Sequence, residues 1–279
     1  MKKRINYNLI FGCALTAITV SIIVLGFFYT PFDPDAMSAG DISTPPDWTH
    51  LFGTDNFGRD ILSRVMQGAG TTLSIAFLAV TIGASAGTLI GGLTGYFGGM
   101  ADEIMMRVND AVTAFPSILL ALVVVSITGP GKSNIVVVLG ILFIPSFARV
   151  VRGEFAKQRH RDYVKNAKLM GVSNLRIMFV HILPNIAPIL LSSIAIGFNN
   201  AVLAEASMSY LGVGVSPTES SLGRMLHDSQ AYLVSSPWQA LSAGICISIL
   251  ILGFALISEG LGYRPSWQTI AKRRRKANA

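Results

Sequence analysis

The stretch TGPGKS, residues 128–133, ends as a nucleotide-binding P-loop ends, and its chemistry would be the binding of ATP phosphates. A P-loop closes backbone N–H groups around the phosphates, which requires a glycine five residues before Gly131. Ser126 stands at that position instead. Apolar runs at 118–127 and 135–144 flank the stretch, so we predict a turn between two buried segments and no ATP site on this chain.

Other residues that could do chemistry are few and scattered. None of the four histidines has a cysteine or carboxylate at metal-ligand spacing; they are His50, His160, His181 and His227. The two cysteines, Cys13 and Cys246, lie in separate apolar segments and suggest neither a disulfide framework nor a metal cluster. We therefore expect no catalytic site, no metal site and no cofactor bound by this chain.

The composition defines the class of protein that must position the remaining polar residues. Of the 279 residues 51% are hydrophobic and only 13% are charged, with a mean hydropathy of +0.55. A soluble domain averages about 25% charged residues, so we predict an all-α polytopic membrane protein. Six segments are long and apolar enough to cross a bilayer: Leu9–Phe28, Thr72–Tyr96, Ala111–Thr128, Asn134–Val151, Ile186–Ser207 and Trp238–Gly262.

The basic residues orient these spans. With the N-terminus in the cytoplasm, the inner segments hold 18 of the 22 Lys and Arg residues, so both termini are predicted to be cytoplasmic. The net charge of +7 thus reflects topology and does not call for nucleic acid, although the basic tail could contact anionic lipid. We divide the chain into an anchor with an outer loop (1–71), a membrane-spanning core (72–262) and the tail (263–279).

The long cytoplasmic segment at 152–185 predicts two short amphipathic helices. The apolar face of the first would carry Tyr163, Val164, Ala167 and Met170. Gly171 fits the position after a helix where a left-handed residue is needed, and Ser173 can cap the second helix. The apolar face of the second would carry Leu175, Met178, Phe179 and Ile182, with Pro184 ending it. Two interpretations stay open: an element lying in the lipid headgroups, or a docking element for a cytosolic partner.

The outer loop carries two compact groups of turn residues. They are Gly53, Thr54 and Asp55, followed by Gly58, Arg59 and Asp60. Asp and Thr side chains can bind local N–H groups while Gly supplies positive φ, which favours a tight surface loop braced by Arg59 with a carboxylate. Contact with a protein partner on the outer side is the functional alternative, and both can hold.

Polar residues within the fifth span are candidates for a transport pathway, because such residues usually face a bundle interior. They are Asn199, Asn200, Glu205 and Ser207. Adjacent residues point about 100° apart on a helix, so one of the two asparagines can line the pathway while the other bridges helices. Glu205 lies near the outer end of the span, where simple contact with water is the alternative.

Four blocks in order resemble the permeases of ABC importers, in particular the oligopeptide, dipeptide and nickel branch. They are HLFGTDNFGRDILSRV (50–65), MRVNDAVTAFPSILLAL (106–122), YVKNAKLMGVSNLRIMFVHILPN (163–185) and EASMSYLGVG (205–214). The third block is similar to the cytoplasmic "EAA" loop, and the residues that match its motif are Ala167, Gly171, Leu183 and Pro184. Lys165 and Asn166 stand where that motif usually has Glu and Ala, so we expect an acidic partner residue opposite Lys165.

This resemblance implies a type I importer bundle in the bacterial cytoplasmic membrane, with a coupling helix seated in an ATP-binding subunit. The implied partners are a second permease, usually a different chain, two ATPase subunits that bind ATP and Mg, and an extracytoplasmic substrate-binding protein. Peptides, or nickel and other metal chelates, are the implied cargo. A stand-alone secondary transporter or channel is the alternative; it would need intramembrane carboxylates for a coupling ion.

Overall fold

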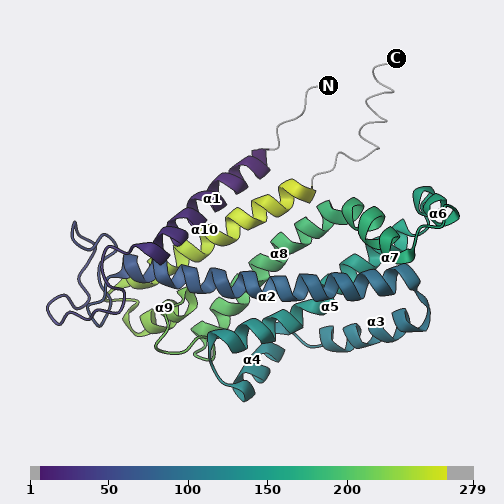
Figure 1. Ribbon diagram of the computed structural model, residues 1–279. Helices are drawn as coiled ribbons and strands as arrows, with labels where there is room; N and C mark the ends of the chain where they lie inside the picture. Colours follow the sequence, from purple (N-terminus) through teal and green to yellow (C-terminus); the bar gives the residue numbers. More distant parts are fainter. Residues whose placement is uncertain (1–6, 263–279) are drawn as a thin grey trace, which may run out of the picture.

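The computed structural model describes residues 7–262, and within that range the chain is a bundle of helices joined by turns and one long outer loop (Figure 1). The predicted basic tail, 263–279, lies outside the described residues. The helices are α1 (Tyr7–Phe28), α2 (Ile61–Phe97), α3 (Gly99–Thr113), α4 (Ser117–Thr128), α5 (Lys132–Gln158), α6 (Asp162–Leu169), α7 (Asn174–Arg176), α8 (Leu183–Tyr210), α9 (Leu222–Ser229) and α10 (Pro237–Gly262). Five long apolar helices and one bent pair give the six spans that the sequence predicts.

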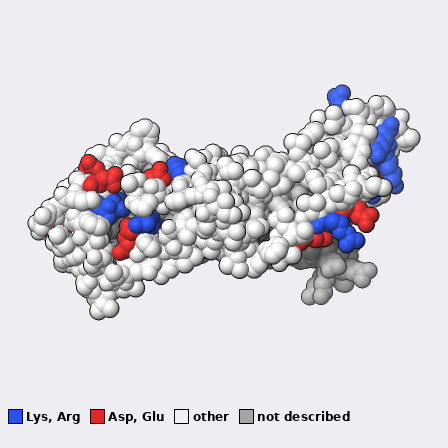
Figure 2. Space-filling view, turned by 90° about the horizontal axis from the view of Figure 1, so that it is seen from below, with Lys and Arg blue, Asp and Glu red and all other residues white. Residues whose placement is uncertain are grey.

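Charged side chains gather toward the two ends of the molecule, with a broad uncharged band between them on the face shown in Figure 2. The outer loop and α9 lie at one end, and α6 lies at the other (Figure 1). An uncharged band between two charged ends is the surface that a bilayer requires, because its hydrocarbon core is about 30 Å thick and excludes ions.

Helix α2 joins the two ends of the molecule. Its 37 residues span roughly 55 Å at 1.5 Å per residue, and it packs along α5. Glycines at 83, 87, 91 and 95 repeat every four residues on the face toward α5. A Cβ added at Gly91 would overlap the carbonyl oxygen of Ala148, so the two backbones approach as closely as glycine permits.

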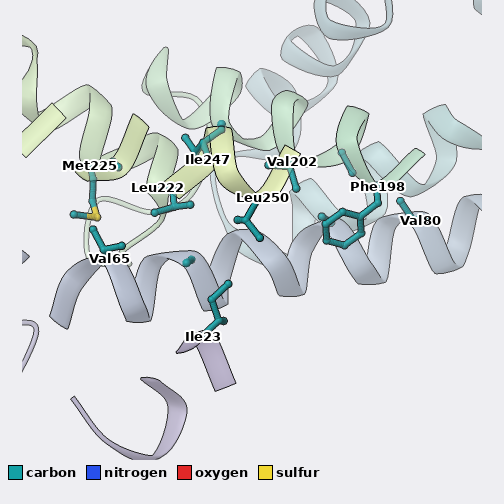
Figure 3. Packing of buried hydrophobic residues seen from close by; sticks show 14 of the residues in the cluster. Ile23, Val65, Val80, Phe198, Val202, Leu222, Met225, Ile247 and Leu250 are labelled. Atoms are coloured by element: carbon teal, nitrogen blue, oxygen red, sulfur yellow. The ribbon is translucent and has the colours of Figure 1, made fainter. Parts of the chain in front are cut away.

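The largest hydrophobic cluster packs α2 against α8, α9 and α10 (Figure 3). Phe198 of α8 stacks on Phe254 of α10 with ring centroids 3.9 Å apart. Ile23 brings α1 into the same cluster and is 1% exposed. In Figure 3, Val65 and Val80 of α2 face Met225 and Phe198 respectively. This packing holds α1 and α10 side by side across α2.

The third span, predicted as one helix at 111–128, consists of two helices in the structure. Helices α3 and α4 meet at 82° across residues 114–116. Pro116 accounts for the break, since proline disfavours helical geometry in the residue before it. Two ion pairs hold α3 on α5: Arg149 to Asp110 at 2.8 Å and Arg152 to Asp102 at 2.6 Å.

Other predicted spans are also shorter than the helices that contain them, and the difference is largest for α2 and α5. Helix α2 begins at Ile61, eleven residues before the predicted start, because Asp60 caps it by accepting from the Ser63 N–H at 2.8 Å. Helix α5 runs to Gln158 and continues through Pro145. Hydropathy detects only the apolar middle of each helix, so polar extensions beyond the bilayer escape it.

The second cytoplasmic helix does not stop at Pro184, contrary to the prediction. Residues 174–210 form one continuous helical rod, in which a π-helical turn (Ile177–Ile182) precedes α8. Pro184 lies in the first turn of α8, where a missing N–H is tolerated. The second predicted cytoplasmic helix and the fifth span therefore belong to one continuous helix.

Candidate functional site

Helix α6 and the turn after it form the inner tip of the molecule. Val164 is fully buried and Ala167 is 7% exposed, so these two residues seat α6 on the bundle. Gly171 has φ of +77°, and its N–H donates to the Lys168 carbonyl at 3.0 Å. The Val172 N–H donates to the Ala167 carbonyl at 3.1 Å, which completes a Schellman motif. The predicted left-handed residue at Gly171 is confirmed.

The tip is tied to the inner end of α2. The Tyr96 hydroxyl donates to Asn174 Oδ1 at 2.8 Å, and Lys168 Nζ lies 4.9 Å from the Tyr96 ring centroid. The Tyr163 hydroxyl donates to Gln158 Oε1 at 3.0 Å, and burial raises the pKa of this phenol above its ordinary value. The third hydrophobic cluster contains residues of α2, α5, α6 and α8, so α6 is packed directly against the inner ends of these helices.

The π-helical turn changes which residues of the second predicted helix are buried. Its buried residues are Ile177, Met178, Ile182 and, in α8, Ile186. Leu175 and Phe179 were predicted on this face but are 60% and 46% exposed. A π-turn bonds residue i to i+5, so the side chains after it rotate relative to an α-helical projection. Leu183 is half-buried and Pro184 is exposed.

An exposed apolar group stands on the tip. Leu169 is 86% exposed and Met170 is 82% exposed, so Met170 does not lie on the buried face where its spacing placed it. It falls at the helix C-cap, where the chain leaves the helical path. Lys165 is exposed and lies 3.6 Å from Asp162 of the same helix. Among the described residues, this tip combines exposed apolar side chains with surrounding basic ones, a composition suited to docking a protein partner.

A groove of about 410 Å³ runs between α4, α5 and α8. Its polar lining consists of Ser117, Ser146, Ser193 and Asn200, and leucine, isoleucine, valine and phenylalanine line most of the rest. None of its lining residues carries a charge. The Asn200 side chain is on the exposed surface of this chain, within a span. Because an amide facing lipid is costly, we expect water, solute or another protein chain to lie against this groove.

The two asparagines diverge as their 100° separation predicts. Asn199 lies against α10, where its amide nitrogen can donate to the Ile251 carbonyl and its oxygen can accept from the Ala255 N–H, each at 3.2 Å. It bridges helices, whereas Asn200 lines the groove. Ser207 is half-buried in α8. Glu205 is fully buried, which excludes the alternative that it simply meets water at the outer surface.

The residues of the outer-loop motif, 53–60, contact one another through hydrogen bonds and an ion pair. The Asp55 carboxylate accepts from the N–H groups of Phe57 and Arg59 and pairs with Arg59 Nε at 2.7 Å. This is the bracing predicted for a tight loop. Gly53 and Gly58 have φ of +74° and +75°, and a Cβ at Gly58 would overlap the Ser38 carbonyl oxygen.

Thr54 and Asp60 fasten this loop to the bundle. Thr54 is fully buried, and its carbonyl accepts from Trp238 Nε1 of α10 at 3.2 Å. Asp60 is 3% exposed and accepts from Ser63 of α2 and from His50 Nδ1 at 2.9 Å. The motif thus anchors the outer loop at the start of both α2 and α10. Sequence reasoning missed Trp238, whose only signal is an indole at the start of a span.

Asp60→Ala is expected to loosen this anchor. The substitution removes the N-cap of α2 and leaves His50 without its partner, which should lower the free energy of unfolding by about 1–2 kcal/mol. Thermal unfolding of the purified chain in detergent measures the effect. Asp47→Ala is the control, since that exposed aspartate binds only N–H groups of its own turn. Equal stability of both variants would contradict the anchoring role.

The stretch TGPGKS is a turn, as predicted. It joins α4 to α5, and the Gly131 N–H donates to the carbonyl of Gly214 at 3.1 Å. Asn134 Nδ2 closes the turn on the carbonyls of Thr128 and Gly129. These groups are used in internal contacts at the outer end of the bundle.

The bundle of spans and its uncharged groove fit the membrane component of a solute transporter. The chain belongs to the family of binding-protein-dependent transport system inner membrane components, whose pattern matches residues 87–264. The family expected from the four sequence blocks is thereby confirmed, and with it a multi-pass membrane permease.

Individual relatives are similar over most of their length. The chain is 34% identical over 262 residues to the dipeptide transport system permease protein DppC of Haemophilus influenzae, covering 92% of this chain and 89% of that one. It is 41% identical over 217 residues to the DppC protein of Alkalihalophilus pseudofirmus, covering 77% and 71% respectively. It is 36% identical over 230 residues to the glutathione transport system permease protein GsiD of Pectobacterium atrosepticum, covering 82% and 75%.

The fold also matches a solved structure. A chain of the inward-facing MetNI methionine ABC transporter superposes with a TM-score of 0.58, covering 71% of this chain and 96% of that chain. At 18% identity, this likeness supports the fold alone. It agrees with the importer-type bundle expected from the sequence.

Proposed function

We propose that this chain is a permease subunit of an ATP-driven importer that moves peptides into the cytoplasm. The observation that carries the proposal is the inner tip, where Leu169 and Met170 stand exposed on a helix whose opposite face is packed on the bundle. A water-soluble surface gains nothing from exposing these side chains, whereas a docking surface buries them. The relatives named for dipeptide and glutathione transport support peptides as the cargo.

Membership of the binding-protein-dependent family supports the partners that we propose. Two ATPase subunits would bind ATP and Mg and would receive α6 in a cleft, with an acidic residue facing Lys165. A second permease would cover the groove, and an extracytoplasmic binding protein would deliver the solute to the outer loop. Both termini would lie in the cytoplasm, on the same side as α6. Nickel is less well supported than peptides, because none of the three relatives described above is named for it.

The coupling mechanism rests on continuity between the tip and the spans. Closure of the ATPases would displace α6, and the rod at 174–210 together with α2 would carry the displacement across the membrane. The ATPases can shift the bundle only by their differential affinity for its two states. Coupling therefore needs a direct connection between the tip and the spans. The hydrogen bond from Tyr96 of α2 to Asn174 of α7 supports such a connection.

Isolation of the tagged chain from its native membrane in mild detergent tests the assembly. Mass spectrometry of the copurifying proteins is expected to find a second permease and P-loop ATPases. A chain that purifies alone and catalyses uptake into liposomes without ATP would overturn the proposal in favour of a secondary transporter. A copurifying extracytoplasmic binding protein would identify the cargo through its bound ligand.

We also propose that the groove lined by Asn200 belongs to the transport pathway. Its amide and hydroxyl groups can exchange hydrogen bonds with peptide amides, and its apolar surface can accept varied side chains. An uncharged lining suits a pathway through which many peptides must pass without being held. Ser207 and Glu205 do not line this groove.

Asn200→Leu is expected to raise the KM for peptide uptake by about three- to tenfold, as loss of one or two solute hydrogen bonds implies. The variant keeps the number and branching of the side-chain heavy atoms but removes every polar atom. Initial rates of radiolabelled dipeptide uptake, with the ATPases present, measure the effect. Ser126→Ala is the matched control, because this hydroxyl donates to the Leu122 carbonyl of its own helix and does not line the groove. Unchanged KM for Asn200→Leu would remove the groove from the pathway.

A further inference from the structure

Glu205 stands at the centre of a buried hydrogen-bond relay at the outer end of α8. One carboxylate oxygen accepts from the Thr72 hydroxyl of α2 at 2.8 Å, and the other accepts from the Ser209 hydroxyl at 2.7 Å. All three residues are at most 1% exposed. No basic side chain within the described residues forms an ion pair with Glu205.

Each hydroxyl also accepts from the backbone of the segment that follows α8. Thr72 Oγ1 accepts from the Leu222 N–H at 3.3 Å, and Ser209 Oγ accepts from the Val215 N–H at 3.2 Å. A hydroxyl has one proton and two lone pairs. Both hydroxyls donate their hydrogen bonds to Glu205, so each hydroxyl keeps its lone pairs free to accept from one of the two N–H groups.

The chain from Leu211 to Leu222, the outer segment, is thus fastened near both of its ends. Its backbone lies directly on α8: a Cβ at Gly214 would overlap Ser209 Oγ. Gly223, which follows the segment, is also close, since a Cβ there would lie 2.5 Å from the Ala206 carbonyl oxygen. Val215 is 1% exposed and Leu222 is fully buried, although Pro217, Thr218 and Glu219 between them are exposed.

The outer segment also packs into a hydrophobic cluster that it shares with the groove. The lining residues Leu139 and Ala204 belong to the second hydrophobic cluster, and this cluster includes Val215. Val213 packs against the same cluster. Moving the outer segment off α8 would therefore withdraw Val215 from the cluster that supports the lining residues Leu139 and Ala204.

We propose that Glu205 is a positioning residue that holds the outer segment as the outer gate of the groove, and that it is not a contact for the solute. The groove's role rests on the proposed function, but the gate is a property of this chain alone. A carboxylate is required because it accepts hydrogen bonds from both hydroxyls at once. An amide at this position has one accepting oxygen and one donating nitrogen, so one hydroxyl would lose its acceptor.

Labelling of a buried cysteine tests the gate. The background carries Cys13→Ala and Cys246→Ala, which removes both native cysteines, and Val215→Cys places a thiol on the buried face of the outer segment. A membrane-impermeant maleimide is applied from outside to intact cells that express the chain with its native partners. Glu205→Gln is expected to raise the labelling rate about tenfold or more, as expected for loss of a buried hydrogen bond.

Matched variants make each outcome decisive. Glu219→Gln removes an exposed carboxylate from the same segment and should leave the rate unchanged. Thr72→Val keeps Glu205 but removes the acceptor for the Leu222 N–H, so it should raise the rate as well. This second variant decides the question if Glu205→Gln aggregates on size-exclusion chromatography. Labelling of folded Glu205→Gln or Thr72→Val at the parent rate would overturn the gate.

The labelling requires neither solute nor transport. A chain that fails to import peptides but shows the Glu205-dependent labelling would keep the gate and reject the proposed function. A chain that imports peptides but shows no change in labelling with Glu205→Gln would keep the proposed function and reject the gate. If Glu205 contacted the solute instead, Glu205→Gln would alter the KM for uptake without exposing the thiol that Val215→Cys introduces.

Discussion

Gly171→Pro is expected to abolish peptide uptake while leaving the chain inserted in the membrane. Gly171 has φ of +77°, whereas the proline ring holds φ near −65°. Its N–H also donates to the Lys168 carbonyl, a bond that proline cannot make. The C-terminal turn of α6 must therefore rearrange, and with it the exposed Leu169 and Met170. The spans lie outside this turn, so insertion should be retained.

Uptake of a radiolabelled dipeptide by cells that contain the partner subunits, normalised to the amount of chain in the membrane, measures the effect. Gly171→Asn is the conservative comparison, because asparagine tolerates the left-handed conformation, and it should retain most of the uptake. Gly153→Ala is the control at the inner end of α5, where a Cβ would meet no atom within 4 Å. Full uptake by Gly171→Pro would exclude α6 as the coupling element.

Gly91→Ala is expected to destabilise the bundle as a whole. The added Cβ would overlap the Ala148 carbonyl oxygen and would lie 3.0 Å from its carbonyl carbon, so two helix backbones must separate. Overpacking of this kind costs about 1–3 kcal/mol, and backbone atoms cannot relax as a flexible side chain can. Helices α2 and α5 connect the outer loop to the tip. A local separation of the two helices should therefore lower the stability of the whole bundle.

The melting temperature of the purified chain in detergent should fall by about 5 °C or more. Gly92→Ala is a closely matched control: it makes the same substitution one residue along the same helix. There the nearest atom to the added Cβ is Phe155 Cζ at 3.4 Å, an ordinary contact with a side chain. Equal melting temperatures for the two variants would show that α2 and α5 pack less closely than the structure indicates.

Local features of the chain were predictable because their causes lie within a few residues. Six spans follow from apolar runs longer than the bilayer is thick, and the break after α6 follows from a glycine placed where a helix needs positive φ. The bracing of Asp55 by Arg59 joins residues four apart. Coupling through 163–184 stays a prediction, supported by exposure of Leu169 and Met170 rather than tested by it.

Errors arose where a regular period was assumed. The predicted apolar face at 175–182 is rotated because a π-turn replaces the α-helical period, and no local composition signal marks that turn. Met170 leaves the face because it falls at the C-cap. The third span bends because Pro116 disrupts it, although its apolar residues alone fit a straight helix.

By itself, the sequence determined that this protein crosses the membrane about six times, that it carries no P-loop of its own, and that it belongs with importer permeases. Only the tertiary structure decided which groups Glu205 and the glycines of α2 contact. Thr72 lies 133 residues from Glu205, and Leu222 lies 150 residues from Thr72, so their meeting depends on how the helices pack. Propensity and hydropathy act between near neighbours in the chain, whereas a buried hydrogen-bond relay is set by atoms brought together from distant segments.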